Sequence, residues 1–205
     1  MALSRFRFHS LATALVLLVI LAGCAGAGRG PAQASPQPAS RYPVTEADAR
    51  FMTAMIGHHS QALVMAGLAP TNGASAAVRR LAERIISGQQ DEIATMQQWL
   101  RDHGRPVPEG HHAGHGHLMP GMLTEAQLKA LEAARGPEFD RLFLTLMIQH
   151  HRGAVAMVKE LVGTPGAAQE DRVFKFASDA NVDQTTEIAR MERMLSDLPA
   201  GESSS

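Results

Sequence analysis

The sequence predicts an all-α protein in which two helical hairpins form a four-helix bundle. Capping and turn residues delimit four long segments and one short one, and none alternates apolar and polar residues as a β-strand would. The pattern "MIGHHSQALVMA", which starts at Met55, recurs as "MIQHHRGAVAMV" at Met147. The chain has 205 residues, 45% of them hydrophobic and 19% charged, which is a globular composition with enough length for one core.

The N-terminus has the features of a targeting segment. A basic region with Arg5 and Arg7 precedes the apolar run "LATALVLLVILAG", which ends at Cys24, the only cysteine. The ending "LAGC" resembles a bacterial lipoprotein lipobox. That resemblance implies removal of residues 1–23 as a lipoprotein signal peptide and lipidation of Cys24. The alternative is an ordinary secretory signal with a chance cysteine.

This start predicts an extracytoplasmic protein, lipid-anchored to a bacterial membrane in the periplasm or at the cell surface. Residues 24–43 are rich in Ala, Gly, Pro and Ser and are predicted to form a flexible tether. The mature chain would have no free thiol, so soft metal ligands would have to come from methionine, of which the chain has 11. A net charge of -1 gives no indication of a nucleic-acid partner.

The first hairpin is predicted over residues 45–103. "TEAD" at residues 45–48 is typical of a capping box, so a helix is expected over about 45–67. "APTNG", which begins at Ala69, has turn chemistry. A second helix is expected over about 74–103, where "HGRP" stops it.

A linker and a short helix are predicted over residues 104–136, and a second hairpin over residues 137–198. The short helix opens at "TEAQ" and ends at "RGP". Helices of the second hairpin are expected over 137–162 and about 167–198, separated by "GTPG". Residues 199–205 are predicted to be a disordered tail.

The two hairpins are repeats of each other. The residues that match at an offset of 92 include Asp48, Phe51, Met55, His58, His59, Ala62 and Met65 with Asp140, Phe143, Met147, His150, His151, Ala154 and Met157. The partner helices match as "QQDEIATM" and "QTTEIARM" at an offset of 95. Two such hairpins, joined by a linker that can cross the bundle, predict ferritin-like connectivity for the domain over residues 44–198.

The doubled pattern D-x-x-F-x-x-x-M-I-x-H-H-x-x-A-x-x-M resembles the DUF305 family of bacterial envelope proteins, over roughly residues 44–197. "MPGMLTEAQLKAL", from Met119, also resembles that family's connector. The resemblance implies a ferritin-like helical bundle that is often secreted or lipid-anchored. It implies a tie to copper handling, as in some members, and no established enzyme activity.

The histidine pairs are the main candidates for a metal site. Met55 precedes His58 and His59 by three and four residues, so both rings flank it on a helix. Neutral imidazole binds copper or zinc, and nearby thioethers favour copper, Cu(I) in particular. The predicted ligands are His58, His59, His150, His151, Met55 and Met147. Each hairpin has its own rings and methionine, which favours separate or loosely coupled sites. The alternative is core histidines satisfied by hydrogen bonds.

Further residues are candidates for supporting these ligands. They are Asp48, Met52, Gln89, Glu92, Met96, Asp140, Gln184, Glu187 and Met191. If the first turn is centred near residue 70, Glu92 lies on the order of 13 Å from the level of His58. A purely structural polar network that includes Glu92 and Asp48 is therefore an equal alternative. Met65, Met157 and Met194 are predicted to fill gaps in the core.

The linker "HGRPVPEGHHAGHGHLMPGM" has five of the ten histidines. Its glycines and prolines disfavour a fixed site, so a mobile metal-capturing loop is predicted. The candidate linker ligands are His111, His112, His115, His117, Met119 and Met122. The alternative is a solvated loop with a chance composition.

Together these features predict a lipid-anchored metal-binding protein that sequesters or transfers copper, as Cu(I) or Cu(II), with zinc or another transition metal as the alternative. A second hypothesis is a ferritin-like metal oxidase acting on Cu(I) or another metal. It would need Glu-x-x-His on helices, and the only such spacing joins Glu109 to His112 in the linker. A third hypothesis is a non-metal envelope interaction module. No catalytic residue is predicted, and a non-enzyme is favoured. The expected partners are a metal ion and, through the anchor, a membrane; an oligomer is compatible with the sequence.

Overall fold

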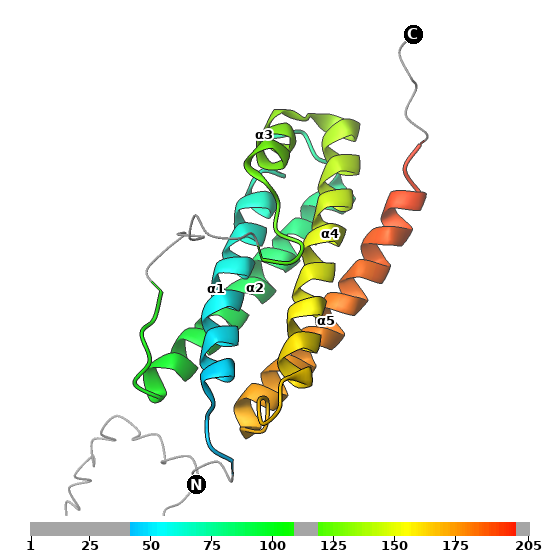
Figure 1. The fold of residues 1–205 in the computed structure, drawn as a ribbon. Helices are drawn as coiled ribbons and strands as arrows, with labels where there is room; N and C mark the ends of the chain where they lie inside the picture. Colours follow the sequence, from blue (N-terminus) through cyan, green and yellow to red (C-terminus); the bar gives the residue numbers. More distant parts are fainter. Residues whose placement is uncertain (1–41, 109–118, 200–205) are drawn as a thin grey trace, which may run out of the picture. The chain divides into compact units, whose positions relative to one another are not determined.

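The structure is a computed structural model that describes residues 42–108 and 119–199. These residues form α1 (Glu46–Gly67), α2 (Ala76–Asp102), α3 (Glu125–Ala133), α4 (Gly136–Gly163) and α5 (Asp171–Ser196), with no strand among them (Figure 1). The predicted all-α fold of two hairpins and a short connecting helix is confirmed. The signal peptide, most of the tether and most of the tail lie outside the described residues.

Local sequence explains where the helices begin. The predicted capping box is present: the Thr45 hydroxyl accepts a hydrogen bond from the Asp48 N–H, and the Asp48 carboxylate accepts one from the Thr45 N–H. α5 begins at Asp171 rather than near Ala167 as predicted. The reason is that the Glu170 side chain accepts hydrogen bonds from the N–H groups of Arg172 and Val173, which makes it the N-cap.

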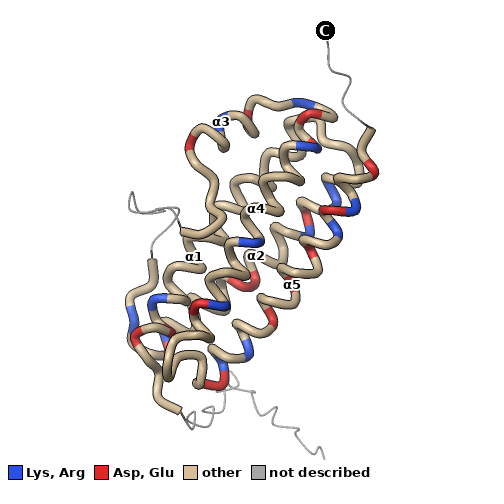
Figure 2. Tube along the Cα trace, turned by 45° about the vertical axis from the view of Figure 1, so that its right-hand side comes forward, with Lys and Arg blue, Asp and Glu red and all other residues tan. Residues whose placement is uncertain are grey.

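The two hairpins meet through their first helices. α1 packs along α2, α4 packs along α5, and α1 also packs against α4 (Figure 1). From Phe51 to Gly67, α1 has no Lys, Arg, Asp or Glu, as expected of a helix covered on several sides. Figure 2 shows the charged residues gathered mainly along α2 and α5. None of the described helices is both long and apolar enough to cross a membrane.

Each hairpin also binds the turn of the other through a buried aspartate. Asp48 Oδ1 accepts a hydrogen bond of 2.7 Å from the Ala168 N–H, in the turn between α4 and α5. Asp140 accepts from the Ser75 N–H at 3.1 and 3.2 Å, in the turn between α1 and α2. These two aspartates match each other in the sequence repeat, so the two contacts are reciprocal. Both therefore fasten the hairpins together at their ends.

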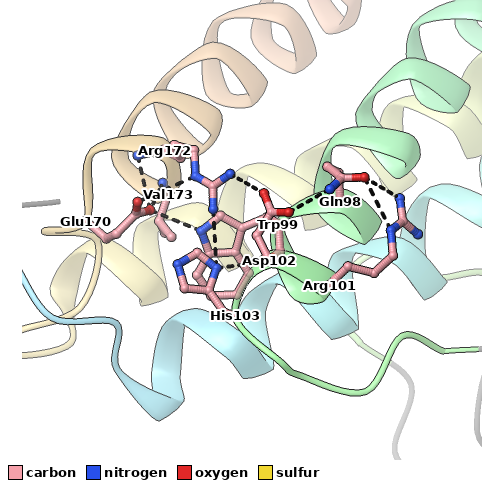
Figure 3. Close-up of polar contacts among 8 residues, drawn as sticks. All are labelled: Gln98, Trp99, Arg101, Asp102, His103, Glu170, Arg172 and Val173. Atoms are coloured by element: carbon pink, nitrogen blue, oxygen red, sulfur yellow. Dashed lines mark hydrogen bonds and ion pairs between the residues drawn. The ribbon is translucent and has the colours of Figure 1, made fainter. Parts of the chain in front are cut away.

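A polar cluster joins the end of α2 to the start of α5 (Figure 3). The buried Glu170 carboxylate accepts a hydrogen bond from Trp99 Nε1 at 3.1 Å. Arg172 donates to Asp102 at 2.6 Å, and this hydrogen bond is the main cause of the lowered pKa of the Asp102 carboxyl. His103 lies against the Trp99 ring, with 4.3 Å between ring centroids. Its Nδ1 also lies 3.3 Å from Arg172 Nη2, so His103 is part of the contact between the hairpins.

Candidate metal site

The four paired histidines lie together where α1 packs against α4. His58, His59 and His151 are 0% exposed and His150 is 1% exposed. The rings of His58 and His150 are 3.9 Å apart between centroids and inclined at 37°, so the pairs of the two hairpins touch. Within each pair the centroids are 6.4 Å and 6.1 Å apart. The sequence favoured separate or loosely coupled sites; this contact favours one coupled centre.

The inner rings, His58 and His150, both hydrogen-bond to backbone carbonyl oxygens. His58 Nε2 lies 3.0 Å from the carbonyl oxygen of Pro120, and His150 Nε2 lies 3.0 Å from that of His58. A carbonyl oxygen only accepts hydrogen bonds, so each Nε2 must donate its proton. A neutral ring with its proton on Nε2 keeps a lone pair on Nδ1.

The outer rings, His59 and His151, hydrogen-bond to carboxylates on the partner helices. His59 Nε2 lies 2.6 Å from Glu92 Oε2, and His151 Nε2 lies 2.7 Å from Glu187 Oε2. The histidines are buried, whereas the side chains of Glu92 and Glu187 are 19% and 22% exposed. The carboxylate–imidazole pair orients the ring and assigns its proton to Nε2, as the hydrogen-bonded partners of metal-bound histidines do.

All four Nδ1 atoms are buried and have no hydrogen-bond partner within the described part of the chain. An unpaired buried acceptor costs about 1–3 kcal/mol. Such a cost at four equivalent atoms is unusual, because buried polar groups are nearly always paired. Four oriented lone pairs with protons held on the opposite nitrogens are suited to binding a metal ion.

Burial keeps the inner rings uncharged. Desolvation, reinforced by the neighbouring His59, lowers the pKa of His58 to about 3. Desolvation, then the proximity of His58, lowers the pKa of His150 well below its ordinary value. Both rings are therefore neutral at pH 7, which is the form that binds metals.

The segment that precedes α3 covers these rings. Pro120, whose carbonyl accepts from His58, packs directly on α4: a Cβ atom added to Gly153 would lie 1.9 Å from the Pro120 oxygen. Gly121 has a φ of 76°, which favours glycine. On α1, Gln61 holds Leu123 through two hydrogen bonds of 3.1 and 2.7 Å.

The repeat is broken where this segment crosses it. At the offset of 92, Gly57 corresponds to Gln149 and Gln61 corresponds to Gly153, so Gly and Gln are exchanged between the helices. The glycines make room: the position of a Gly57 Cβ is 3.6 Å from Met119 Cε. The glutamines bind the segment: Gln149 Nε2 donates to the Gly121 carbonyl at 3.3 Å. The exchange is present in the sequence, but the crossing of this segment between α1 and α4 was not predicted from it.

The predicted methionine ligands are fully buried. Met55 lies in a core cluster with Met52 and Met96, and Met147 lies in a second cluster with Met191. Each cluster thus contains thioethers from both hairpins, because the first also includes Met157 and the second also includes Met65. The other predicted core methionines also pack in these clusters: Met65, Met157 and Met194.

The expected position of Glu92 was wrong. The helix geometry placed it on the order of 13 Å from the level of His58, but its Oε2 lies 2.6 Å from His59 Nε2. α1 ends at Gly67 and α2 begins only at Ala76, so the turn adds length. Side chains on α2 also point back toward its N-terminus, which carries the carboxylate toward His59. Asp48 and Asp140, in contrast, bind turns at the ends of the hairpins.

The structure describes only two of the six candidate linker ligands. His111, His112, His115 and His117 lie outside the described residues. Met119 is partly exposed next to Gly57, and Met122 is buried. Over residues 42–108 and 119–199, no three His, Cys, Asp or Glu side chains are already arranged around one metal position. The imidazoles are thus oriented as ligands, but their nitrogens do not yet converge.

These features define a helical-hairpin repeat with buried histidine pairs, in each of which one ring is oriented by a carboxylate and the other by a backbone carbonyl. The chain belongs to the DUF305 family, whose model, described as a domain of unknown function, matches residues 48–195. This confirms the family resemblance in the sequence. No match is found among curated proteins.

Several solved structures are similar to the chain. A DUF305 fragment from Deinococcus radiodurans has a TM-score of 0.67 and 33% identity, over 76% of this chain and 99% of its own. CopM in a Cu(II)-bound form has a TM-score of 0.60 and 32% identity, over 73% of this chain and 96% of its own. CopM in a Cu(I)-bound form has a TM-score of 0.59 and 29% identity, over 75% and 98%.

Proposed function

We propose that this protein is an extracytoplasmic metal-binding protein that sequesters or transfers copper. The observation that supports this most strongly is the set of four buried Nδ1 atoms that have no partner among the described residues, each opposite an Nε2 that is held by an oxygen acceptor. His58, His59, His150 and His151 would provide the imidazole ligands. Because His58 and His150 are in ring contact, the four would act as one coupled centre.

Copper is the metal that this donor set suits best. Imidazole binds both Cu(I) and Cu(II), and thioethers select Cu(I). Met55 and Met147 are the sulfur candidates, with Met52 and Met96 adding thioethers in the first hairpin. The copper-bound forms of the similar protein CopM support the same choice. Because the imidazole nitrogens do not yet converge, binding would require small side-chain movements.

The metal would reach this centre from outside the cytoplasm. The apolar N-terminal run and the lipobox support export and lipidation of Cys24, and a similar DUF305 protein from Streptomyces coelicolor is described as secreted. The histidine-rich linker would capture metal ahead of the bundle. We expect Cys24→Ser to release the protein from the membrane fraction with its helicity unchanged; retention in that fraction would contradict the anchor.

The first experiment is a metal assay on protein purified without a histidine tag. Apo protein should take up Cu(I) in competition with a chromophoric chelator, and the tightest binding should persist when His111, His112, His115 and His117 are replaced by Ser. Helix-mounted ligands are already ordered, whereas the linker would lose chain entropy on binding. If the tightest phase vanished with the linker histidines, the bundle would not be the main site.

A further inference from the structure

A groove between α2 and α5 contains a second set of unpaired buried acceptors. Its volume is about 330 Å³, and Gln89 and Gln184 line it. These glutamines are 4% and 2% exposed, and the side-chain Oε1 of each has no hydrogen-bond partner among the described residues. They match each other at the offset of 95, so the groove is lined from both hairpins alike.

The same groove is acidic. Glu92, Asp183 and Glu187 line it, and of its lining residues only Arg84 is basic. Burial and then the neighbouring Glu92 and Glu187 raise the pKa of the Asp183 carboxyl. The carboxylates are therefore close enough to disfavour one another's charge. A bound cation would relieve that repulsion.

The donors in this groove differ from those at the histidines. Carboxylate and amide side chains line it, with no imidazole and no thioether. Each glutamine Oε1 is itself buried, so its amide would turn toward the groove on binding. Oxygen donors of this kind suit Mg²⁺, Ca²⁺ and Mn²⁺ rather than copper. At roughly 30 Å³ for each water, the groove has room for an ion that keeps several waters. Such an ion does not require three converging carboxylates.

We propose that the groove between α2 and α5 binds one hard divalent cation, partly hydrated, through the amide oxygens of Gln89 and Gln184 and the carboxylate of Asp183. Glu92 and Glu187 add negative charge while their Oε2 atoms remain engaged with His59 and His151. This site differs in donor chemistry from the proposed copper centre, which it adjoins through Glu92 and Glu187.

Mn²⁺ tests the proposal directly, because its free aquo ion gives a strong electron paramagnetic resonance signal. Titration of the metal-free full chain should show one bound Mn²⁺. Asp183→Asn should weaken binding at least tenfold, because it removes the one carboxylate not engaged with an imidazole. Asp171→Asn removes the same charge from the exposed start of the same helix, outside the groove lining, and should change the affinity less than threefold. Arg84→Gln should tighten binding.

Pulsed resonance of the bound ion separates this site from the histidines. The proposed site predicts water and oxygen ligation without the ¹⁴N coupling of a bound imidazole. Three results would overturn the proposal: no Mn²⁺ binding at 1 mM, equal weakening by the Asp183 and Asp171 variants, or imidazole coupling in the bound ion. Each of these outcomes leaves the copper titration unaffected, so failure here is distinguishable from failure of the proposed function.

Discussion

His150 Nε2 lies 3.0 Å from the backbone carbonyl oxygen of His58, so the second histidine pair is oriented by the helix that carries the first. Within the described residues this contact is not reciprocated by the carbonyl of His150, because His58 instead binds the carbonyl of Pro120. The two halves of the repeat are therefore inequivalent at their centre. A substitution in α1 or α4 that moves one histidine pair should therefore also alter the orientation of the other pair.

The carboxylates that hold the outer rings should control copper affinity. Glu92→Gln and Glu187→Gln each replace a charged acceptor with a neutral amide, which orients the ring less well and makes it less basic. Loss of such a partner typically lowers metal affinity about 10–100-fold. Cu(I) competition titrations would measure this. Glu83→Gln, on the exposed face of α2, is the matched control and should bind like the wild type.

If both glutamate variants retained wild-type affinity, the carboxylate–imidazole pairs would be structural only. Circular dichroism of each variant would confirm that the helices are intact.

The apo protein should lose stability as the pH falls below about 6.5. His58 has a native pKa of about 3 and His150 one well below normal, so between pH 3 and 6.5 the unfolded chain binds protons that the native chain does not. Each such group then costs about 1.4 kcal/mol per pH unit. Above about pH 6.5 neither state binds these protons, so the two rings then cause no loss of unfolding free energy. Urea unfolding in the presence of a chelator should give a free energy roughly 2–3 kcal/mol lower at pH 5.5 than at pH 7.5.

Replacing His58 and His150 together by Gln removes both titrating rings and should flatten that difference. An equally steep loss in this variant would assign the pH dependence to other groups.

The close contact of Pro120 with α4 should make Gly153 sensitive to substitution. Gly153→Ala places a methyl group against the Pro120 carbonyl, which must move and release His58 Nε2. Overpacking of this kind costs about 1–3 kcal/mol in unfolding free energy. Gly88→Ala, in the middle of α2 with nothing within 4 Å of the added atom, is the control. It should be neutral or stabilise the protein by up to about 1 kcal/mol.

Thermal unfolding would compare these two alanine variants. A Gly153→Ala protein as stable as Gly88→Ala would show that the segment before α3 does not pack as described.

Much of the fold could be predicted because its signals are local. The capping boxes at Thr45 and Thr124 and the repeat of Asp48 at Asp140 placed every helix to within a few residues. The start of α5 was missed because Glu170, as the N-cap, looks like an ordinary surface glutamate in the sequence. Its burial depends on Trp99, 71 residues away.

The candidate site was predicted in part. Adjacent histidines in an apolar helix indicated a functional centre, but the partner of His59 depended on the length of the turn after α1. The role of Pro120 depended on a chain crossing that helical periodicity does not encode. The only local sequence feature that indicated this crossing was the exchange of Gly57 and Gln61 for Gln149 and Gly153 between the two repeats.

The most direct test of the central claim is Cu(I) affinity and stoichiometry after removal of one histidine pair, in protein in which His111, His112, His115 and His117 are Ser. Gln is the suitable replacement, because its amide can still donate where Nε2 does but has no imidazole Nδ1. A coupled centre predicts that His58→Gln with His59→Gln, and equally His150→Gln with His151→Gln, weakens tight Cu(I) binding at least 100-fold while circular dichroism is unchanged. Half the stoichiometry at unchanged affinity would contradict a shared centre. Wild-type binding by both folded variants would contradict copper binding by the histidines altogether.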